Sequence, residues 1–320
     1  MMLNVIAAIA AQGRRVAPVV SGGVTALQDW TNRSTAAGVI KAVRFTVAST
    51  VTNNRHIDGA EANVVFDATD GIIGDGCLRI DVPAASGSNP GSWRVALNDA
   101  WATDAQGFGS TAFYIQYRVK LGPNRMLASV GGGGFKMMNL AEYRVSSPNS
   151  SFSNTVNEIV FNNQNWRGAF AAYRQDGTGF PDFSVNFGAE IKLQSARDNG
   201  AGIADPFARY CLYQSGNASP GCWFLQELSW FTVYARIELP SLGGSAGNRF
   251  DCYVARAGET SYTQLFNNSG FLIGADPVAP LGPNGIWLLP YDTSRTSASY
   301  STWHKYDQLI VSLQPIACPL

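Results

Sequence analysis

Charged residues are scarce in this chain. Lysine, arginine, aspartate and glutamate make up 14% of its 320 residues, and 23 basic and 23 acidic side chains give a formal net charge of zero. Nucleic acids and anionic membrane surfaces are bound through a basic excess, so the composition favours neither as a partner. A near-neutral surface favours association instead. We therefore expect the protein to bind copies of itself and other subunits of an assembly.

Long apolar runs are also absent. No run approaches the length of a membrane span, and the apolar stretch at residues 3–11 is followed, not preceded, by Arg14 and Arg15. That order of charges is wrong for a signal peptide. Residues 24–37 show no strong period. We interpret residues 1–40 as an N-terminal arm for assembly or attachment, and residues 41–320 as one domain.

Metal-binding spacings are missing as well. The five cysteines and two histidines form no CxxC pair and no Cys/His cluster, and the acidic loop around Asp70 does not follow EF-hand spacing. We therefore predict no metal and no cofactor. Cys211 and Cys222 flank a loop rich in turn-forming residues, which would bring its ends together. A disulfide and a pair of free thiols both fit this pattern.

What the chain does have is a series of alternating segments bounded by Gly, Pro, Asn and Ser. In residues 77–82, Leu78, Ile80 and Val82 alternate with polar residues, which is typical of a strand with one buried face. Further segments of this kind are residues 42–47, 92–97, 112–120, 157–162, 230–237, 248–254, 285–291 and 303–312. In the last segment, strict alternation places Tyr306, Gln308 and Ile310 on one face. Many strands with hardly any helical period predict an all-β protein, a two-sheet antiparallel sandwich.

One stretch carries the residue types that hold sugars. Sugar binding uses flat aromatic rings against the pyranose and planar amides or carboxylates for its hydroxyls. The candidate ligand-binding residues are Glu158, Asn162, Gln164, Trp166, Arg167 and Tyr173. Glu158 and Asn162 share a strand face, and Gln164 continues past the strand's end. In the alternative interpretation, Glu158 and Arg167 form a structural ion pair and Trp166 fills the core.

The same stretch and the C-terminus resemble a family of proteins encoded by tailed bacteriophages and prophages. The matching segments are Glu158-Ile159-Val160 with Asn162, Arg167, Gly168 and Tyr173, then Cys211-Leu212-Tyr213, Pro220 to Phe224, Trp287 to Tyr291 and Tyr306 to Ser312. The resemblance runs from about residue 110 to the end. It implies a concanavalin A-like (lectin/glucanase) jelly-roll sandwich that binds ligands across the concave face of its larger sheet.

Signs of an enzyme are weak. Retaining glycosidases on this fold place two carboxylates at alternate strand positions, and no such Glu-x-Asp-x-x-Glu motif occurs here. A polysaccharide lyase needs a group that neutralises the uronate and a Tyr or His base. Arg167, Asn162, Tyr173 and His304 are candidates, although the Gln-Ile-His strand of alginate lyases is absent. For His304, a place at the rim of the sheet and a catalytic role both remain open. We predict no catalytic residues.

These observations predict a non-enzymatic virion structural protein, assembled in the host cytoplasm. We expect it at the tail tip, baseplate or fibre, where it contacts other virion proteins and a host surface glycan. Two alternatives fit the same sequence. One is a capsid decoration protein, and the other is a polysaccharide lyase or depolymerase on the same fold.

Overall fold

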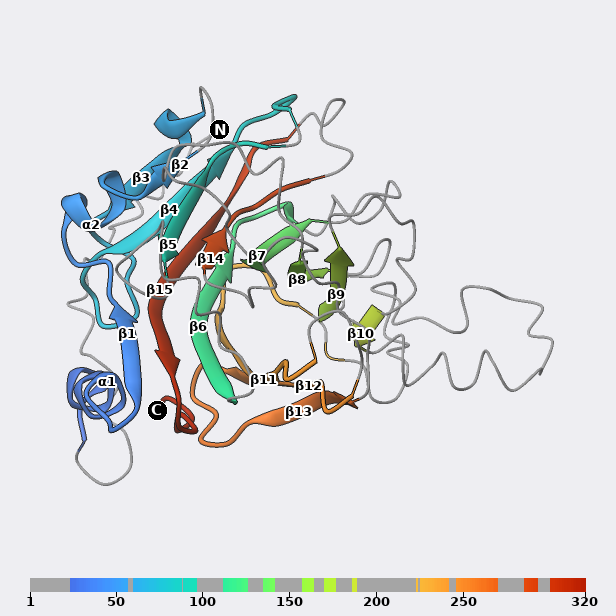
Figure 1. Ribbon diagram of the computed structural model, residues 1–320. Coiled ribbons are helices and arrows are strands. Elements are labelled where there is room, and N and C mark those ends of the chain that lie inside the picture. The colour runs from blue at the N-terminus through green and yellow to red at the C-terminus, as the bar shows by residue number, and fades with distance from the viewer. Residues whose placement is uncertain are drawn as a thin grey trace, which may run out of the picture.

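The backbone forms two stacked antiparallel sheets, here called sheet A and sheet B (Figure 1). A computed structural model describes residues 24–56, 60–87, 89–96, 112–125, 135–141, 157–163, 170–176, 186–188, 223, 225–241, 246–269, 285–292 and 300–320. Strands separated by long stretches of sequence are neighbours in both sheets. The C-terminal strand, for example, lies in the middle of sheet A. This architecture is the two-sheet antiparallel jelly-roll sandwich that the sequence predicts.

Sheet A has eight strands, and its long central members are β6 and β15. Its order is β13 (Thr263–Ser269), β12 (Arg249–Arg256), β11 (Trp230–Glu238), β6 (Phe113–Leu121), β15 (Thr302–Ser312), β4 (Cys77–Val82) and β3 (Val64–Asp67), while β1 (Val39–Val43) pairs with the second half of β15. Sheet B has seven strands with the order β10 (Asn186–Gly188), β9 (Phe170–Asp176), β8 (Asn157–Asn163), β7 (Lys136–Ala141), β14 (Gly285–Leu288), β5 (Ser92–Ala96) and β2 (Arg55–His56).

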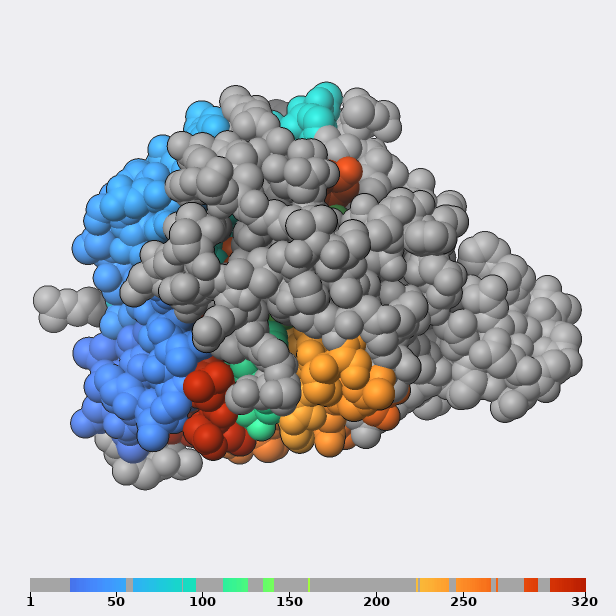
Figure 2. All heavy atoms as spheres, viewed as in Figure 1, coloured from blue at the N-terminus to red at the C-terminus, as the bar shows by residue number. Residues whose placement is uncertain are grey.

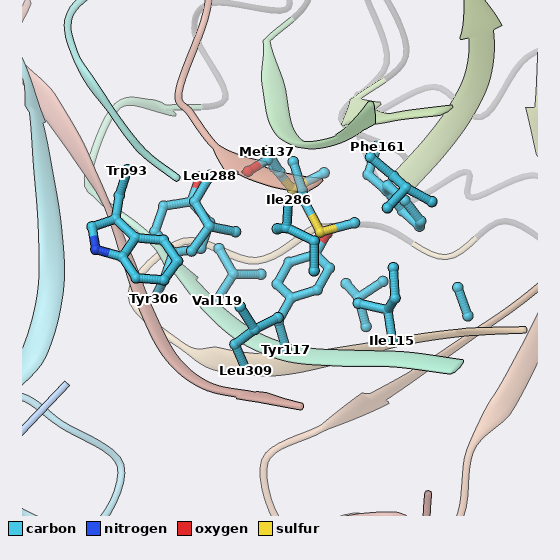
Figure 3. Close-up of a cluster of buried hydrophobic side chains, with 14 of the residues drawn as sticks. Trp93, Ile115, Tyr117, Val119, Met137, Phe161, Ile286, Leu288, Tyr306 and Leu309 are labelled. Carbon is cyan, nitrogen blue, oxygen red and sulfur yellow. Dashed lines mark hydrogen bonds between the residues drawn. The ribbon is translucent and has the colours of Figure 1, made fainter. Parts of the chain in front are cut away.

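The inward faces of the two sheets form the main core. Tyr117 of β6 meets Phe161 of β8 edge to face, with ring centroids 6.2 Å apart, and both side chains are fully buried. In Figure 3, Tyr117 lies with Val119 and Leu309 of sheet A, facing Ile286 and Leu288 of sheet B, and Phe161 lies to their right. Burial of each such side chain contributes roughly 1.5–3 kcal/mol. The alternating sequence pattern therefore forms a sandwich because its apolar residues meet between two sheets.

Strand β15 departs from the predicted alternation. Its pairing with β6 is shifted between Asp307 and Ile310, and Gln308 has a positive φ of 53°. Such a bulge adds one residue to the strand and turns the following side chains to the other face. Tyr306 therefore shares the core with Leu309 and not with Ile310. The prediction that Tyr306, Gln308 and Ile310 share one face was wrong for this reason.

A helix covers part of the outer face of sheet A. Helix α1 (Ala26–Ser34) begins with a capping box, in which Thr25 and Gln28 exchange side-chain to backbone hydrogen bonds. Trp30 packs with Ile310 and with other apolar residues of that face. In Figure 2, the described N-terminal residues (blue), the C-terminal end (red) and β11–β12 (orange) lie side by side on the surface. The sequence pattern did not predict this helix. The boundary proposed near residue 40 stays a prediction.

Two short helices complete the described elements. They are α2 (Ala48–Thr52) and the 3-10 helix η1 (Glu61–Asn63). Over the described residues, every helix is too short to cross a membrane.

Candidate functional site

The predicted ligand-binding residues fall on two neighbouring strands of sheet B or outside the described residues. Glu158 and Asn162 belong to β8, and Tyr173 belongs to β9. Gln164, Trp166 and Arg167 lie outside the described residues, as do Cys211 and Cys222. For Glu158, Asn162 and Tyr173, the backbone register gives the position of each residue in sheet B. It shows which residues of the neighbouring strands belong to the same rows of the sheet.

Two rows cross sheet B at these positions. In β8, positions Glu158, Val160 and Asn162 alternate with Phe161, whose side chain is in the core. Val160 pairs with Tyr173 on one side and with Asn139 of β7 on the other, while Asn162 pairs with Lys136. Directly opposite residues in an antiparallel sheet share a face. The rows therefore bring described side chains of β7 next to the predicted positions.

The first row continues across the sheet as a buried polar floor. Asn139 pairs with Trp287 of β14, and Trp287 pairs with Arg94 of β5. The guanidinium of Arg94 lies 5.4 Å from the centre of the Trp287 ring, a cation–π distance. The exposed fractions of Asn139, Trp287 and Arg94 are 0%, 7% and 3%. An amide, an indole and a guanidinium thus lie side by side under the outer face of sheet B.

The second row offers groups that solvent can reach. Lys136 and Tyr291 are both partly exposed, and the Lys136 ammonium nitrogen lies 5.0 Å from the centre of the Tyr291 ring. The backbone N–H of Lys136 also donates to the Tyr291 carbonyl at 2.7 Å. Tyr291 packs against the cluster of Trp287 and Leu289. We call Arg94, Asn139, Trp287, Lys136 and Tyr291 the sheet B face.

Lys136 differs from the basic residues of sheet A in its surroundings. Among the described residues, no carboxylate lies within ion-pair distance of its ammonium. Sequence reasoning missed this lysine. In the sequence it stands two positions after a run of four glycines at residues 131–134. A lone cation beside a glycine run at the start of a strand was the available signal.

A buried hydrogen-bond network lies below Tyr291. Arg125 donates from Nε to His304 Nε2 at 2.6 Å, so this histidine nitrogen accepts and the ring is neutral. His304 Nδ1 lies 3.0 Å from the Tyr306 hydroxyl, which donates to the Met137 carbonyl at 2.8 Å. Burial, followed by the charge of Arg125, lowers the pKa of His304 well below its usual value. His304 is 0% exposed, so of the two alternatives for this residue the rim position was wrong.

The carboxylates of the acidic loop near β3 form ion pairs with a lysine. On the outer face of sheet A, the Lys305 ammonium lies 2.7 Å from carboxylate oxygens of both Asp67 and Asp70. Although burial opposes ionisation, hydrogen bonds from Lys305 and Thr69 lower the pKa of Asp67 to about 2. Within the described residues, no three His, Cys, Asp or Glu side chains are grouped to hold a metal. These carboxylates are satisfied within the chain.

Comparison with known proteins supports the fold. No protein-family model and no curated protein matches the sequence. Among solved structures, the marine PL-14 alginate lyase from Aplysia kurodai is similar with a TM-score of 0.53 and 11% identity, over 86% of this chain and 99% of the lyase. Alginate lyase Aly36B has a TM-score of 0.46 and 12% identity, over 89% and 96%. The binding domain of botulinum neurotoxin DC has a TM-score of 0.41 and 10% identity, over 88% and 49%. The likeness to the Aplysia enzyme shows a shared jelly-roll fold.

Proposed function

We propose that this protein is a carbohydrate-binding sandwich of a tailed-bacteriophage particle and that it binds acidic polysaccharide through the sheet B face. One observation carries the proposal. Lys136 and Tyr291 are reachable side chains in contact with each other, and Lys136 is in register with the predicted position Asn162. A ring face, an ammonium and an amide are the groups that hold a sugar with a carboxylate.

The charge of Lys136 suggests the ligand class. Its ammonium has no carboxylate partner among the described residues, and the guanidinium of Arg94 lies in the neighbouring floor. A cation at a partly exposed site favours an anionic group over a neutral one. We therefore expect uronate-containing chains to bind more tightly than neutral chains of similar length.

The particle assignment rests on the C-terminal resemblance. The segments Trp287 to Tyr291 and Tyr306 to Ser312, which resemble the phage and prophage family, include half of β14 and much of β15. We propose a location at the tail tip, baseplate or fibre, with other virion proteins and copies of the chain as partners and an envelope glycan as ligand. Immunogold labelling of particles tests this. Gold on the capsid would indicate a decoration protein instead.

A second function, polysaccharide lyase, is favoured by the Lys136–Tyr291 contact itself. β-Elimination requires a base to remove the proton next to the uronate carboxylate, a cation near that carboxylate, and a proton for the departing glycosidic oxygen. Lys136 and Tyr291 are groups of the required kinds and are close together. His304 cannot take part because its ring is fully buried.

The deciding experiment incubates the purified protein with host lipopolysaccharide, exopolysaccharide and a polyuronate. Retention and the release of unsaturated ends are followed together. Lys136→Met and Tyr291→Phe should weaken retention, whereas Arg236→Met, which removes a partly exposed cation from sheet A, should not. Retention without release supports a binding protein, and release that Lys136→Met abolishes supports a lyase. Retention that both sheet B variants leave unchanged would refute this site.

A further inference from the structure

Arg125 is a buried arginine with acceptors from two separate parts of the chain. It follows β6 and is fully buried. Besides its bond to His304, its Nη1 donates to the Asp292 carboxylate and its Nη2 to the Pro290 carbonyl, each at 3.1 Å. Its guanidinium carbon also lies 4.0 Å from the centre of the Phe135 ring. The planar fork of an arginine can serve several acceptors at once in a fixed geometry.

Two of these acceptors immediately flank Tyr291. Pro290 precedes it and Asp292 follows it, so the guanidinium holds the backbone carbonyl before the tyrosine and the side-chain carboxylate after it. Phe135 and Asp292 form an antiparallel bridge, and the next residue, Lys136, donates to the Tyr291 carbonyl. The segment that carries Tyr291 is thus tied to the segment that carries Lys136. The Lys136 ammonium and the Tyr291 ring, 5.0 Å apart, are carried by these two connected segments.

His304 makes the arrangement specific for arginine. Its Nε2 accepts from Arg125 Nε, and its other nitrogen contacts Tyr306, whose hydroxyl donates to Met137. The hydrogen bonds therefore run from the Tyr291 segment through Arg125 to β15 and on to β7. A lysine at residue 125 would keep the charge, but its single ammonium cannot serve three acceptors in the plane of the fork.

From this geometry we infer that Arg125 is the positioning residue of the sheet B face: it fixes Tyr291 against Lys136 without touching the ligand. The expected consequence, weaker glycan binding when the Arg125 guanidinium is removed, rests on the proposed function. Groups that support a binding site from behind set the geometry of the residues in front.

The test compares Arg125→Lys with Arg118→Lys. Arg118 is a matched control because it is also buried, at 4% exposure, but belongs to the outer face of sheet A. Polyuronate affinity is measured by calorimetry well below both melting temperatures. We expect Arg125→Lys to lose roughly tenfold in affinity, the lower end of what loss of a supporting partner costs at metal sites. Arg118→Lys should stay within about twofold, because distant sites act independently.

A local signal separates positioning from general destabilisation. Fluorotyrosine placed at residue 291 reports the surroundings of that ring by fluorine NMR. Its resonance should shift in Arg125→Lys and remain unchanged in Arg118→Lys. If Arg125→Lys does not fold, Asp292→Asn provides the milder variant, since it keeps an acceptor for the guanidinium but removes the ion pair. It should change the signal in the same direction by less.

Two results would overturn the inference. One is unchanged affinity and an unchanged fluorine signal in Arg125→Lys, and the other is equal losses in the two lysine variants. Failure of the proposed function looks different, because the unaltered protein would then retain no polyuronate. The fluorine signal would still show whether Arg125 holds Tyr291.

Discussion

The two outer faces of this sandwich use lysine in opposite ways. On sheet A, Lys305 is buried and pairs with both Asp67 and Asp70, and Lys120 also pairs with Asp70. On sheet B, Lys136 is partly exposed, contacts an aromatic ring and has no carboxylate partner among the described residues. Removing one partner of a buried ion pair is strongly destabilising, whereas a partly exposed cation contributes little to stability. The difference separates a structural face from a candidate binding face of the same protein.

The strongest test of this comparison removes the paired lysine. Lys305→Met would remove the partner that Asp67 and Asp70 share and leave only Lys120 paired with Asp70. Breaking a buried ion pair from one side costs roughly 3–5 kcal/mol. Because the carboxylates are partly exposed and Asp70 keeps Lys120, we expect an effect at the lower end of that range on the free energy of unfolding, measured in urea. Polyuronate retention should be unchanged at a temperature where the variant is folded. Loss of retention would mean that the sheet A face also binds.

A pH titration examines sheet A further through Asp307. Burial raises the pKa of this carboxyl to about 6, although backbone N–H groups of Ile72, Gln308 and Phe45 and the charge of Arg44 oppose the rise. The folded state then binds more protons than the unfolded state between pH about 4 and 6, so stability falls as the pH rises through that window. Across that window the free energy of unfolding should fall by about 2 to 3 kcal/mol in total, since each pKa unit corresponds to 1.36 kcal/mol.

In Asp307→Asn this slope should disappear, whatever constant offset the amide introduces. Asp67 does not interfere, because its lowered pKa of about 2 places its own contribution below that window. That contribution is present above pH about 4 and is lost as the pH falls through about 2. Urea midpoints measured from pH 2 to pH 8 separate the two groups. If stability falls equally with pH in the unaltered protein and in Asp307→Asn, the raised pKa of Asp307 is not the cause of the pH dependence.

Helix α1 allows a smaller change on sheet A. Thr25→Ala removes the oxygen that accepts from the Gln28 backbone and should cost about 1 kcal/mol. Thermal unfolding measures the loss, and Thr25→Ser, which keeps the hydroxyl, is the control. A loss of the same size in Thr25→Ser would show that the cap is not responsible. Polyuronate binding on the opposite sheet should be unaffected in both variants.

The smallest expected effect on stability belongs to Lys136. Lys136→Met should change the free energy of unfolding by less than about 0.5 kcal/mol, because substitutions at partly exposed sites without buried partners are close to neutral. Polyuronate retention should nevertheless fall. The contrast with Lys305→Met is the clearest expression of the difference between the two faces. A destabilisation of several kcal/mol would place Lys136 among the structural cations instead.

Sequence alone located many strands of this fold, although it missed others, including β3, β7 and β13. The segment Cys77–Val82 forms β4 with the predicted bounds, and residues 303–312 agree with β15 to within one residue. Period-two alternation is a local property, so it survives whatever the partner strands are. Helix α1 was missed because its apolar period is weak. Its capping box of Thr25 and Gln28 was the readable signal.

The candidate site could be read only in part. The sequence singled out Glu158, Asn162 and Tyr173 as candidates, and the structure places them on β8 and β9. It could not select Lys136 or Tyr291, because they are 155 positions apart and meet only through the register of sheet B and the bridge between Phe135 and Asp292. The roles of these residues remain predictions.

The sequence by itself determined the all-β class and the apolar faces, since alternation and turn residues act over a few neighbouring positions. The tertiary structure decided which of the charged residues form ion pairs within the chain. Lys305 and Lys136 look alike in a sequence, and so do Arg118 and Arg125. Burial and partner geometry depend on strands brought together from distant parts of the chain, and electrostatic interactions change steeply with both. The bulge at Gln308 follows the same logic, because a local pattern cannot show where a strand adds a residue to fit its partner.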